Sequence, residues 1–351
     1  MAYTTIDDPS AYFQTKLYSG TGSSNSVTND GNSDLQPDWV WIKERNNAVS
    51  HRIFDSSRGV QKRIFSNNTD AESTQSNSLT AFNSDGFTVG DSGSVNGGSD
   101  TYVAWQWKAN GGTTSTLSGG ISAIVQANTT AGFSIVKFTA SGNNNQVEHG
   151  LGAVPHFIIA KGKDVSDNWF IYHKSIGPNG YIMLNQSSAT DSPNSTVWRN
   201  IDPTSQYFYV SSGGFNDDST DVIAYCFAEK QGYSKFGSYT GNGNADGPFI
   251  YTGFKPAWVM IKRTSGTENW VLWDNKRDPF NNFYHVLLPN ASSAEDTSNA
   301  GSGGRYVGDF LSNGFKLRNT HDTSNSSSDY IYMAFAESPF VSSEGVPTTA
   351  R

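Results

Sequence analysis

The stretch PHFIIAK, from Pro155 to Lys161, decides the fold because the chain carries it in three versions. The other two are PDWVWIK, at Pro37 to Lys43, and PAWVMIK, at Pro256 to Lys262. Self-similarity at a long spacing is typical of a duplicated structural unit, so the copies predict the domain map of the chain.

Features at fixed distances follow each copy. A short apolar run ends in a polar residue 18 positions after each proline, and these residues are Asp55, His173 and Asp274. Trp169 and Trp270 stand 14 positions after their prolines. An aromatic-rich stretch closes each copy: YVAWQWK (102–108), VIAYCFAEK (222–230) and IYMAFAES (331–338). The sequence therefore predicts three copies of one module of roughly 100 residues, each long enough to bury a core of its own.

Alternation within the copies predicts β-strands. In the first copy Trp39, Trp41 and Lys43 fall on one face of a strand, while Val40 and Ile42 fall on the other. A proline is tolerated at the first position of a strand, where no ladder donor is needed. Short apolar runs separated by turn residues dominate the chain, and no long helical period occurs. We therefore predict an all-β protein of three tandem antiparallel β-sandwich modules of jelly-roll type.

Changes in composition mark the module boundaries. The polar start of the chain is either a solvated leader or an arm that anchors the chain on another protein, and we adopt the second interpretation. A Gly-, Ser- and Thr-rich linker carries one strand-like run, ISAIVQA, which we expect to add to the edge of a neighbouring module. The predicted segments are the arm at 1–14, module 1 at 15–110, the linker at 111–132, module 2 at 133–230, module 3 at 231–340 and a C-terminal tail at 341–351.

Charge and composition argue against several classes of protein. The formal net charge is −8 and no run of Lys and Arg occurs, so we expect no nucleic-acid partner. No apolar run approaches the roughly 18 residues that a membrane helix needs, and we expect neither membrane insertion nor a signal peptide. The single cysteine, Cys226, excludes an intrachain disulfide. Its apolar surroundings favour a buried structural thiol over a reactive one.

Three acidic loops are candidates for calcium binding. They contain Asp30, Asn32 and Asp34; Asp217, Asp218 and Asp221; and Asp322 near Asp329. The first begins like an EF-hand loop, but Leu35 stands where glycine is required and Trp41 where glutamate is required. Asp and Asn are also the ordinary residues of turns, so we interpret all three loops as solvated turns and predict no metal site.

The remaining polar residues do not predict a catalytic site. His149 and His173 could approach each other in module 2, but no third ligand and no zinc-binding spacing accompany them. The counterparts of His173, Asp55 and Asp274, indicate a polar role at a strand end that all modules share. No motif of a serine hydrolase, P-loop protein or dinucleotide-binding protein occurs. We therefore predict no enzyme, no catalytic residue and no cofactor, although a glycosidase with paired carboxylates is left open.

Two tryptophan pairs offer another candidate surface. Trp39 and Trp41 share one strand face, and Trp105 and Trp107 share another. Such pairs could form a platform for sugar rings or fill a core. The matching strands of the other modules carry ordinary apolar residues such as Tyr225, which favours the core.

Two modules resemble a known family. VEHGLGAVPHFIIAKGK…NWFIYH (147–173) resembles a module repeated in fibre, spike and other structural proteins of tailed bacteriophages. KFGSYTGNGNADGPFIYTGFKPAWVMIKRT…NWVLWD (235–274) resembles a companion form from phages of marine bacteria, including cyanophages. The start of the chain, TTIDDPSAYFQTKLYSG (4–20), is similar to the start of such proteins. Module 1 lacks the HGL and GF-x-P approaches to its proline, module 3 lacks the histidine, and no shaft or coiled coil precedes the modules.

The resemblance implies a structural or receptor-binding role in a virion and no defined catalysis. Because no shaft precedes the modules, we expect a compact part, a short tail fibre or tip protein involved in host-surface attachment and assembled in the host cytoplasm. The usual construction of phage fibres implies a homotrimer whose arm binds other virion proteins and whose loops contact a host glycan or protein. Two alternatives stay open, namely a head or tail decoration protein that binds no receptor and a glycan-degrading tailspike-type enzyme.

Overall fold

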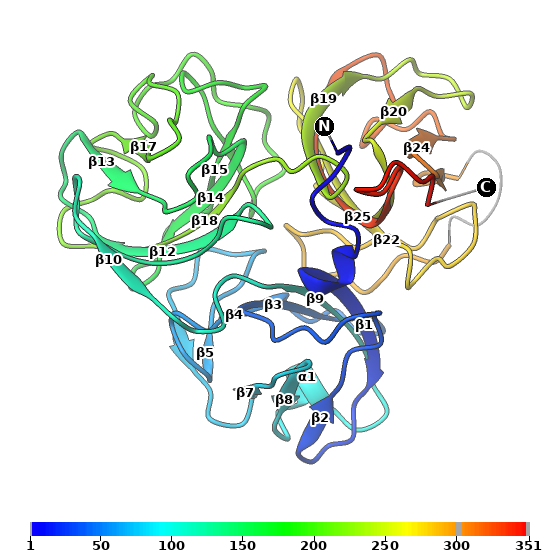
Figure 1. Cartoon of the computed structure of the whole chain (residues 1–351), viewed down its shortest axis with the longest axis horizontal. Helices are drawn as coiled ribbons and strands as arrows, with labels where there is room; N and C mark the ends of the chain where they lie inside the picture. Colours follow the sequence, from blue (N-terminus) through cyan, green and yellow to red (C-terminus); the bar gives the residue numbers. More distant parts are fainter. Residues whose placement is uncertain (1, 299–303, 349–351) are drawn as a thin grey trace.

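The computed structural model describes residues 2–298 and 304–348, and its regular structure is almost entirely β. Three lobes surround a common centre, and each lobe holds one of the repeats found in the sequence (Figure 1). No helix in the described part of the chain is long and apolar enough to cross a membrane. Residues 349–351 of the predicted tail lie outside the described residues.

Each repeat contributes the same antiparallel four-stranded sheet. Repeat 1 has the order β1-β9-β3-β4, with β1 (Phe13–Ser19), β3 (Trp39–Glu44), β4 (Arg52–Asp55) and β9 (Thr101–Trp107). Repeat 2 has the order β12-β18-β14-β15, with β12 (Phe133–Thr139), β14 (Phe157–Gly162), β15 (Phe170–His173) and β18 (Asp221–Phe227). Repeat 3 has the order β19-β25-β21-β22, with β19 (Ser234–Thr240), β21 (Phe254–Arg263), β22 (Val271–Asp274) and β25 (Asp329–Pro339).

The 18-residue spacing in the sequence is the geometry of a strand pair. The aromatic residue two positions after each proline faces the polar strand-end residue, in the pairs Trp39–Asp55, Phe157–His173 and Trp258–Asp274. The register is therefore the same in all three sheets. The prolines precede β3 and β14, as expected for residues that cannot donate to a ladder, while Pro256 lies inside β21 at a shift of register.

A smaller sheet covers the outer face of each large sheet. These strands are β2 (Asn25–Val27), β7 (Leu79–Phe82) and β8 (Phe87–Val89) in repeat 1, β13 (Asn145–Glu148) and β17 (Tyr207–Val210) in repeat 2, and β20 (Phe249–Tyr251), β23 (Gly308–Leu311) and β24 (Gly314–Leu317) in repeat 3. In repeat 1, Val40 and Ile42 of β3 share a core with Val27, Leu79 and Phe87 of the smaller sheet. Equivalent cores lie in the other two repeats. Each repeat therefore buries apolar side chains between two layers.

The inner faces of the three large sheets form a fourth core that belongs to the whole chain. Its members include Trp39, Trp41, Trp105 and Trp107 from repeat 1, Phe133, Phe157, Tyr225 and Phe227 from repeat 2, and Phe236, Trp258, Met333 and Phe335 from repeat 3. Rings of different repeats meet directly, with centroid distances of 4.6 Å for Trp39–Tyr225, 5.7 Å for Trp107–Trp258 and 6.0 Å for Phe227–Phe335. Both faces of each large sheet are thus buried, and the repeats are not independent in their packing.

The remaining elements are short. They are the 3-10 turn η1 (Pro9–Ala11), β5 (Lys62–Arg63), β6 (Ser73–Thr74), α1 (Gly93–Asn96), β10 (Ser115–Leu117), β11 (Ala123–Asn128) and β16 (Ile182–Met183). The strand-like run of the predicted linker forms β11, which pairs antiparallel with the outer edge of β12. With β10, β11 and β16 the sheet of repeat 2 reaches seven strands.

The N-terminal residues lie against repeat 3 of their own chain. The Tyr3 hydroxyl donates to the Gly253 carbonyl at 2.8 Å, and the Thr4 hydroxyl donates to the Gln231 carbonyl at 2.8 Å. Ile6 is buried in the central core. Residues 3–11 therefore cross from repeat 3 to the start of β1, as the N-terminal trace in Figure 1 shows.

Candidate functional site: the junctions between the repeats

The three repeats meet at three junctions. We name each junction by two numbers, first the repeat whose side chain donates a hydrogen bond and then the repeat that accepts it. The junctions are 2/1, 1/3 and 3/2. The same positions of the repeat meet at each of them, so the three repeats close a ring with approximate three-fold symmetry. A head-to-tail contact that closes after three steps is the geometry of a cyclic trimer, and here one chain supplies all three units.

A fully buried ion pair lies at the 2/1 junction. Asp55 Oδ2 is 2.5 Å from Arg58 Nε, and neither side chain is exposed. The Tyr225 hydroxyl of repeat 2 donates to the same carboxylate oxygen at 2.7 Å. Burial disfavours the charged guanidinium, but the negative charges of Asp55 and Glu72 outweigh burial and raise the pKa of Arg58 above its ordinary value. Repeat 2 thus supplies a hydrogen bond that a buried carboxylate of repeat 1 requires.

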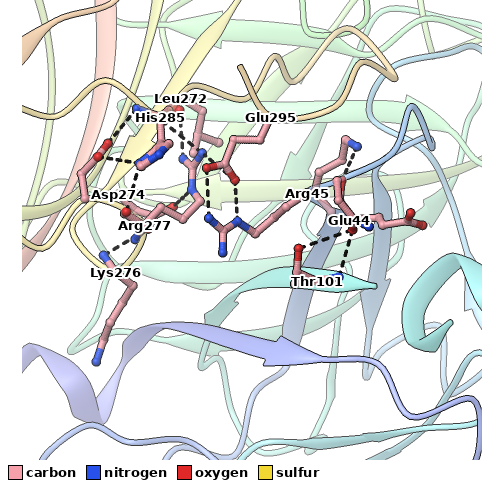
Figure 2. Close-up of polar contacts among 12 residues, drawn as sticks. Glu44, Arg45, Thr101, Leu272, Asp274, Lys276, Arg277, His285 and Glu295 are labelled. Carbon is pink, nitrogen blue, oxygen red and sulfur yellow. Dashed lines mark hydrogen bonds and ion pairs between the residues drawn. The ribbon is translucent and has the colours of Figure 1, made fainter. Parts of the chain in front are cut away.

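The 1/3 junction repeats this arrangement with a different donor. Asp274 Oδ2 is 2.6 Å from Arg277 Nε, and again neither side chain is exposed. The Trp105 indole of repeat 1 donates to Asp274 Oδ2 at 3.0 Å, and the Arg277 guanidinium lies 5.8 Å from the centre of the same indole ring. Arg45 of repeat 1 also forms a two-point ion pair with Glu295 of repeat 3, with distances of 2.5 and 3.1 Å (Figure 2).

The 3/2 junction has none of these charged groups. His173 takes the place of the aspartate, Ile176 follows where the arginines stand, and Met333 replaces the Tyr225 or Trp105 donor. His173 Nδ1 accepts from the Ser175 amide at 3.0 Å, which places the ring hydrogen on Nε2, 3.4 Å from the Tyr332 carbonyl. Burial lowers the pKa of His173 to about 3, so the imidazole is neutral at pH 7. The aspartate, the arginine and the facing hydrogen-bond donor of the other two junctions are therefore all replaced at the 3/2 junction.

A second set of matching contacts lies 14 residues after each proline. The Trp169 indole donates to the Phe65 carbonyl at 2.7 Å across the 2/1 junction. The Trp270 indole donates to the Met183 carbonyl at 2.9 Å across the 3/2 junction. In repeat 1 this position is His51, whose Nδ1 accepts from the Trp41 indole at 2.9 Å. The His51 ring faces the Leu288 carbonyl of repeat 3, although its Nε2 forms no hydrogen bond of ordinary geometry among the described residues.

Backbone hydrogen bonds complete the ring. The Glu72 amide donates to the Lys163 carbonyl at 2.6 Å, the Thr190 amide to the Thr264 carbonyl at 2.9 Å, and the Glu295 amide to the Arg45 carbonyl at 2.7 Å. Each acceptor lies eight positions after a proline of the repeat signature. Each bond joins two repeats, and together the three bonds join every pair.

Three buried lysines end the inner strands. Lys43, Lys161 and Lys262 stand six positions after the three prolines and are fully buried. The Lys161 ammonium of repeat 2 reaches the Thr69 carbonyl of repeat 1 at 2.9 Å. Burial lowers the pKa to about 8 for Lys43 and Lys161 and to about 7 for Lys262. Lys43 and Lys262 donate to carbonyls of their own repeats, those of Asn47 at 3.1 Å and Arg263 at 2.7 Å.

Two of the acidic loops considered as calcium candidates have a carboxylate in ion pairs with lysines. Asp30 lies 3.1 Å from Lys16 and 2.9 Å from Lys276, and Asp221 lies 3.0 Å from Lys163. Across residues 2–298 and 304–348, no group of three or more His, Cys, Asp or Glu side chains is arranged to hold a metal ion. The structure thus does not bring these residues together as a site.

The other candidates from the sequence lie in packed interiors. His149 contacts the Thr204 carbonyl at 3.1 Å, and burial lowers its pKa to about 4; His173 has different partners at the 3/2 junction. Cys226 is fully buried, and burial raises the pKa of its thiol. The tryptophan pairs are also buried, so the core interpretation is confirmed. That core is the one shared by all repeats, which the sequence did not predict.

Sequence reasoning missed the two arginines and the histidine of the junctions. Arg58 and Arg277 both follow their aspartates by three positions, and this shared D-x-x-R spacing was a usable signal. His51 stands at the position of Trp169 and Trp270, but the change of residue type hid the equivalence.

Comparison with known proteins gives a family without an assigned activity. A family model described as a domain of unknown function, DUF7483, matches residues 8–339. The chain belongs to this family. The DUF7483 match spans all three repeats, in agreement with a ring that is one structural unit. No curated protein and no solved structure matches the chain.

Proposed function

We propose that this DUF7483 protein is a structural component of a bacteriophage particle, a short tail fibre or tip protein that takes part in host-surface attachment. The observation that carries the proposal is the closed ring, in which the inner faces of all three large sheets are used to hold the repeats together. The surface left for recognition then consists mainly of loops on a rigid support, which tolerate variation. The phage-like stretches at 147–173 and 235–274 support the assignment to a particle.

The finer description of the fold belongs to the same proposal. We regard each repeat as one small jelly-roll-type sandwich, because a large and a small sheet enclose a core in each. In the proposed homotrimer, the chains contact one another through the outer surfaces of the repeats. The inner faces of the large sheets are not available, because they pack on one another within each chain. Sedimentation of the purified protein tests this point: a species of 38.1 kDa, the mass of one chain, would reject the trimer and leave the internal ring.

Contacts of the N-terminal residues with their own chain limit how the proposed arm, residues 1–14, can bind another protein. Ser343 donates to Asp7 through its amide at 2.7 Å, and the chain from Tyr3 to Ile6 packs on repeat 3. An arm that binds another virion protein therefore does so from the surface of repeat 3, or leaves that surface first. Deletion of residues 2–5 tests the arm, because it removes the contacts of Tyr3 and Thr4 with repeat 3 but keeps the buried Ile6, and incorporation into particles is lost under the proposal.

Electron microscopy of particles labelled with an antibody against the protein tests the function. The proposal expects label at the tail tip or fibres and expects that free protein blocks adsorption of the phage to host cells. Label on the head or along the tail without inhibition would favour the decoration protein. Release of sugar products from host polysaccharide would favour the glycan-degrading enzyme, and absence of label from particles would reject all three.

A further inference from the structure

Two positions near the strand ends are occupied differently at the three junctions. The first is the residue opposite Trp105, Tyr225 or Met333 on the first strand of each large sheet. The second is the residue before the aromatic partner of Asp55, His173 or Asp274. The residues at these two positions are Ile135 and Asp38 at the 2/1 junction, Phe236 and His156 at the 3/2 junction, and Thr15 and Ala257 at the 1/3 junction. The 1/3 junction therefore has the smallest side chains at both positions.

At the 2/1 junction the chain fills the space around these positions. Ile135 is fully buried in the central core. Asp38 accepts from three backbone amides of segment 109–112, at 2.8 to 2.9 Å. The side-chain amide of Gln126 donates to the Ser56 hydroxyl at 2.9 Å. Every polar side chain named here has a partner within the chain.

The 3/2 junction is filled by different groups. Phe236 is fully buried in the central core, and His156 Nδ1 accepts from the Glu229 amide at 3.1 Å. The Glu229 carboxylate lies 2.9 Å from the Lys174 ammonium and 2.6 Å from the Lys235 ammonium of repeat 3. A large ring and an ion-paired cluster thus close this junction.

The 1/3 junction has a pocket at the same place. It has a volume of about 380 Å³, lies between repeats 1 and 3, and is lined by Thr15 and Ala257 among others. Thr15 is only 4% exposed, and its Oγ1 has no hydrogen-bond partner among the described residues. A buried hydroxyl without a partner costs free energy, which a ligand able to bond to it recovers.

The charged groups that line the pocket already have partners. Glu337 lies 2.6 Å from Lys255, and Asp30 lies 2.9 Å from Lys276. The buried Asp278 carboxylate accepts from two backbone amides at 2.9 and 2.8 Å. A charged ligand has to break one of these contacts or lose its own hydration without a counter-charge, so the pocket favours a neutral ligand.

Two further groups are free to contact a ligand. The side-chain amide of Asn275 lines the pocket and forms no hydrogen bond within the described part of the chain. Like the Thr15 hydroxyl, it can donate and accept. Phe280 stands between Pro279 and Asn281, which both line the pocket, and it is 76% exposed. An exposed ring beside hydrogen-bonding groups suits a ligand with an apolar face and hydroxyl groups at its edge.

We propose that the pocket at the 1/3 junction binds a neutral sugar residue, whose ring packs on Phe280 and whose hydroxyl groups bond to Thr15 and Asn275. A sugar ring combines the required properties, since it has no charge, an apolar C–H face and hydroxyl groups that donate and accept. The volume lies near the lower end of the range of roughly 300–1,000 Å³ for small-molecule sites, in agreement with a small ligand. The inference rests on the proposed function only for the source of the sugar, a glycan of the host surface.

NMR titration of the purified full chain with the methyl glycosides of glucose, galactose and mannose tests the site. We expect saturable binding of at least one glycoside. Thr15→Val removes the unpaired hydroxyl with little change of shape and should weaken binding by about tenfold, as for the loss of one hydrogen bond. Thr15→Ser keeps the hydroxyl and should bind like the unmodified protein.

A second pair of variants avoids the buried part of the pocket. Phe280→Ala should weaken binding, whereas Phe249→Ala should not, because Phe249 is also exposed but does not line the pocket. Glucuronate and glucosamine, which carry a charge, should bind more weakly than the glucose glycoside. The proposal is overturned by tighter binding of either charged sugar, by equal affinities of Thr15→Val and Thr15→Ser, by equal affinities of Phe280→Ala and Phe249→Ala, or by no binding of any of the three glycosides.

Failure of this proposal can be distinguished from failure of the proposed function. The titration uses the purified chain, so lack of binding overturns the sugar site even where antibody label is found at the tail tip. Absence of the protein from particles rejects the proposed function, while sugar binding that depends on Thr15 and Phe280 still supports the site.

Discussion

The 1/3 and 3/2 junctions use the same positions of the repeat with opposite chemistry. At the 1/3 junction Asp274, Arg277 and Trp105 form a buried charged contact, whereas the 3/2 junction has a neutral His173 and no charged pair at these positions. The donor at the facing position is present where the acceptor is a carboxylate and absent where it is an imidazole. The comparison teaches that the side chains of each junction are complementary to one another. The stability of the ring therefore depends on this complementarity and not on any single residue.

The largest expected effect comes from separating the buried charges. Arg277→Met leaves Asp274 buried without its cation, and removing one partner of such a pair destabilises by about 3–5 kcal/mol. Denaturant unfolding of the purified protein measures this loss. The double variant Asp274→Asn, Arg277→Met resembles the neutral junction and should lose clearly less; if the double variant is as unstable as the single one, the matching argument fails.

A smaller effect isolates the hydrogen bond across the same junction. Trp105→Phe removes the indole donor to Asp274, and hydrogen bonds to charged groups contribute about 1.5–3 kcal/mol. Trp107→Phe is the matched control, because the Trp107 indole is equally buried but its nitrogen has no partner among the described residues. Denaturant midpoints should fall further for Trp105→Phe than for the control, and equal losses would show that only ring volume matters.

The neutral junction predicts a dependence on pH. The pKa of His173 is lowered to about 3 in the folded protein, against about 6.5 in an unfolded chain. The stabilising contribution of the neutral ring is therefore complete above pH 6.5 and decreases as pH falls toward 3, by about 2 kcal/mol at pH 5. Unfolding free energies of His173→Asn should vary less between pH 7 and pH 5 than those of the unmodified protein. His51 and His149, whose pKa values are also lowered, leave part of the dependence in place.

A further dependence on pH concerns one of the three buried lysines that end the inner strands. Burial lowers the pKa of Lys262 to about 7, so its stabilising contribution is complete above about pH 10.5 and decreases as pH falls toward 7. Lys262→Met removes this ionisation at the expense of one hydrogen bond to a carbonyl. We expect a flatter profile of unfolding free energy from pH 7 to 10, because the variant has no amine that titrates in this range. An unchanged profile would contradict the lowered pKa.

The sequence predicted the strands well because their signal is local. Alternation in PDWVWIK placed Trp39 and Trp41 on one face of β3, and the 18-residue spacing marked Asp55 as a strand end, which the structure places opposite Trp39. The all-β class is confirmed by the same local patterns. These features depend on the period of a strand and on turn residues, both of which can be read from one segment of chain.

The ring could not be predicted from the sequence, because the contacts between repeats produce no recognisable pattern within a single segment of the chain. The bonds from Glu72, Thr190 and Glu295 run between backbone atoms, which any residue can supply. The inner faces of the large sheets carry the apolar residues expected of any core, and nothing in one strand tells whether the opposing side chains come from the same repeat. Only the joint change of His173, Ile176 and Met333 carries a signal of the contact, and it becomes readable once the facing residues are known.

The distance along the chain between Trp105 and Asp274 has a consequence for folding. These partners are 169 residues apart, and the ring cannot close until repeat 3 has been synthesised. Contacts of such separation form slowly, because much chain entropy is lost before they are made. Until then Trp105 and Trp107 lie on an uncovered apolar face, the kind of intermediate that aggregates or engages chaperones. Synthesis of the last repeat is thus the step that lets the ring close and covers the apolar inner faces of the first two repeats.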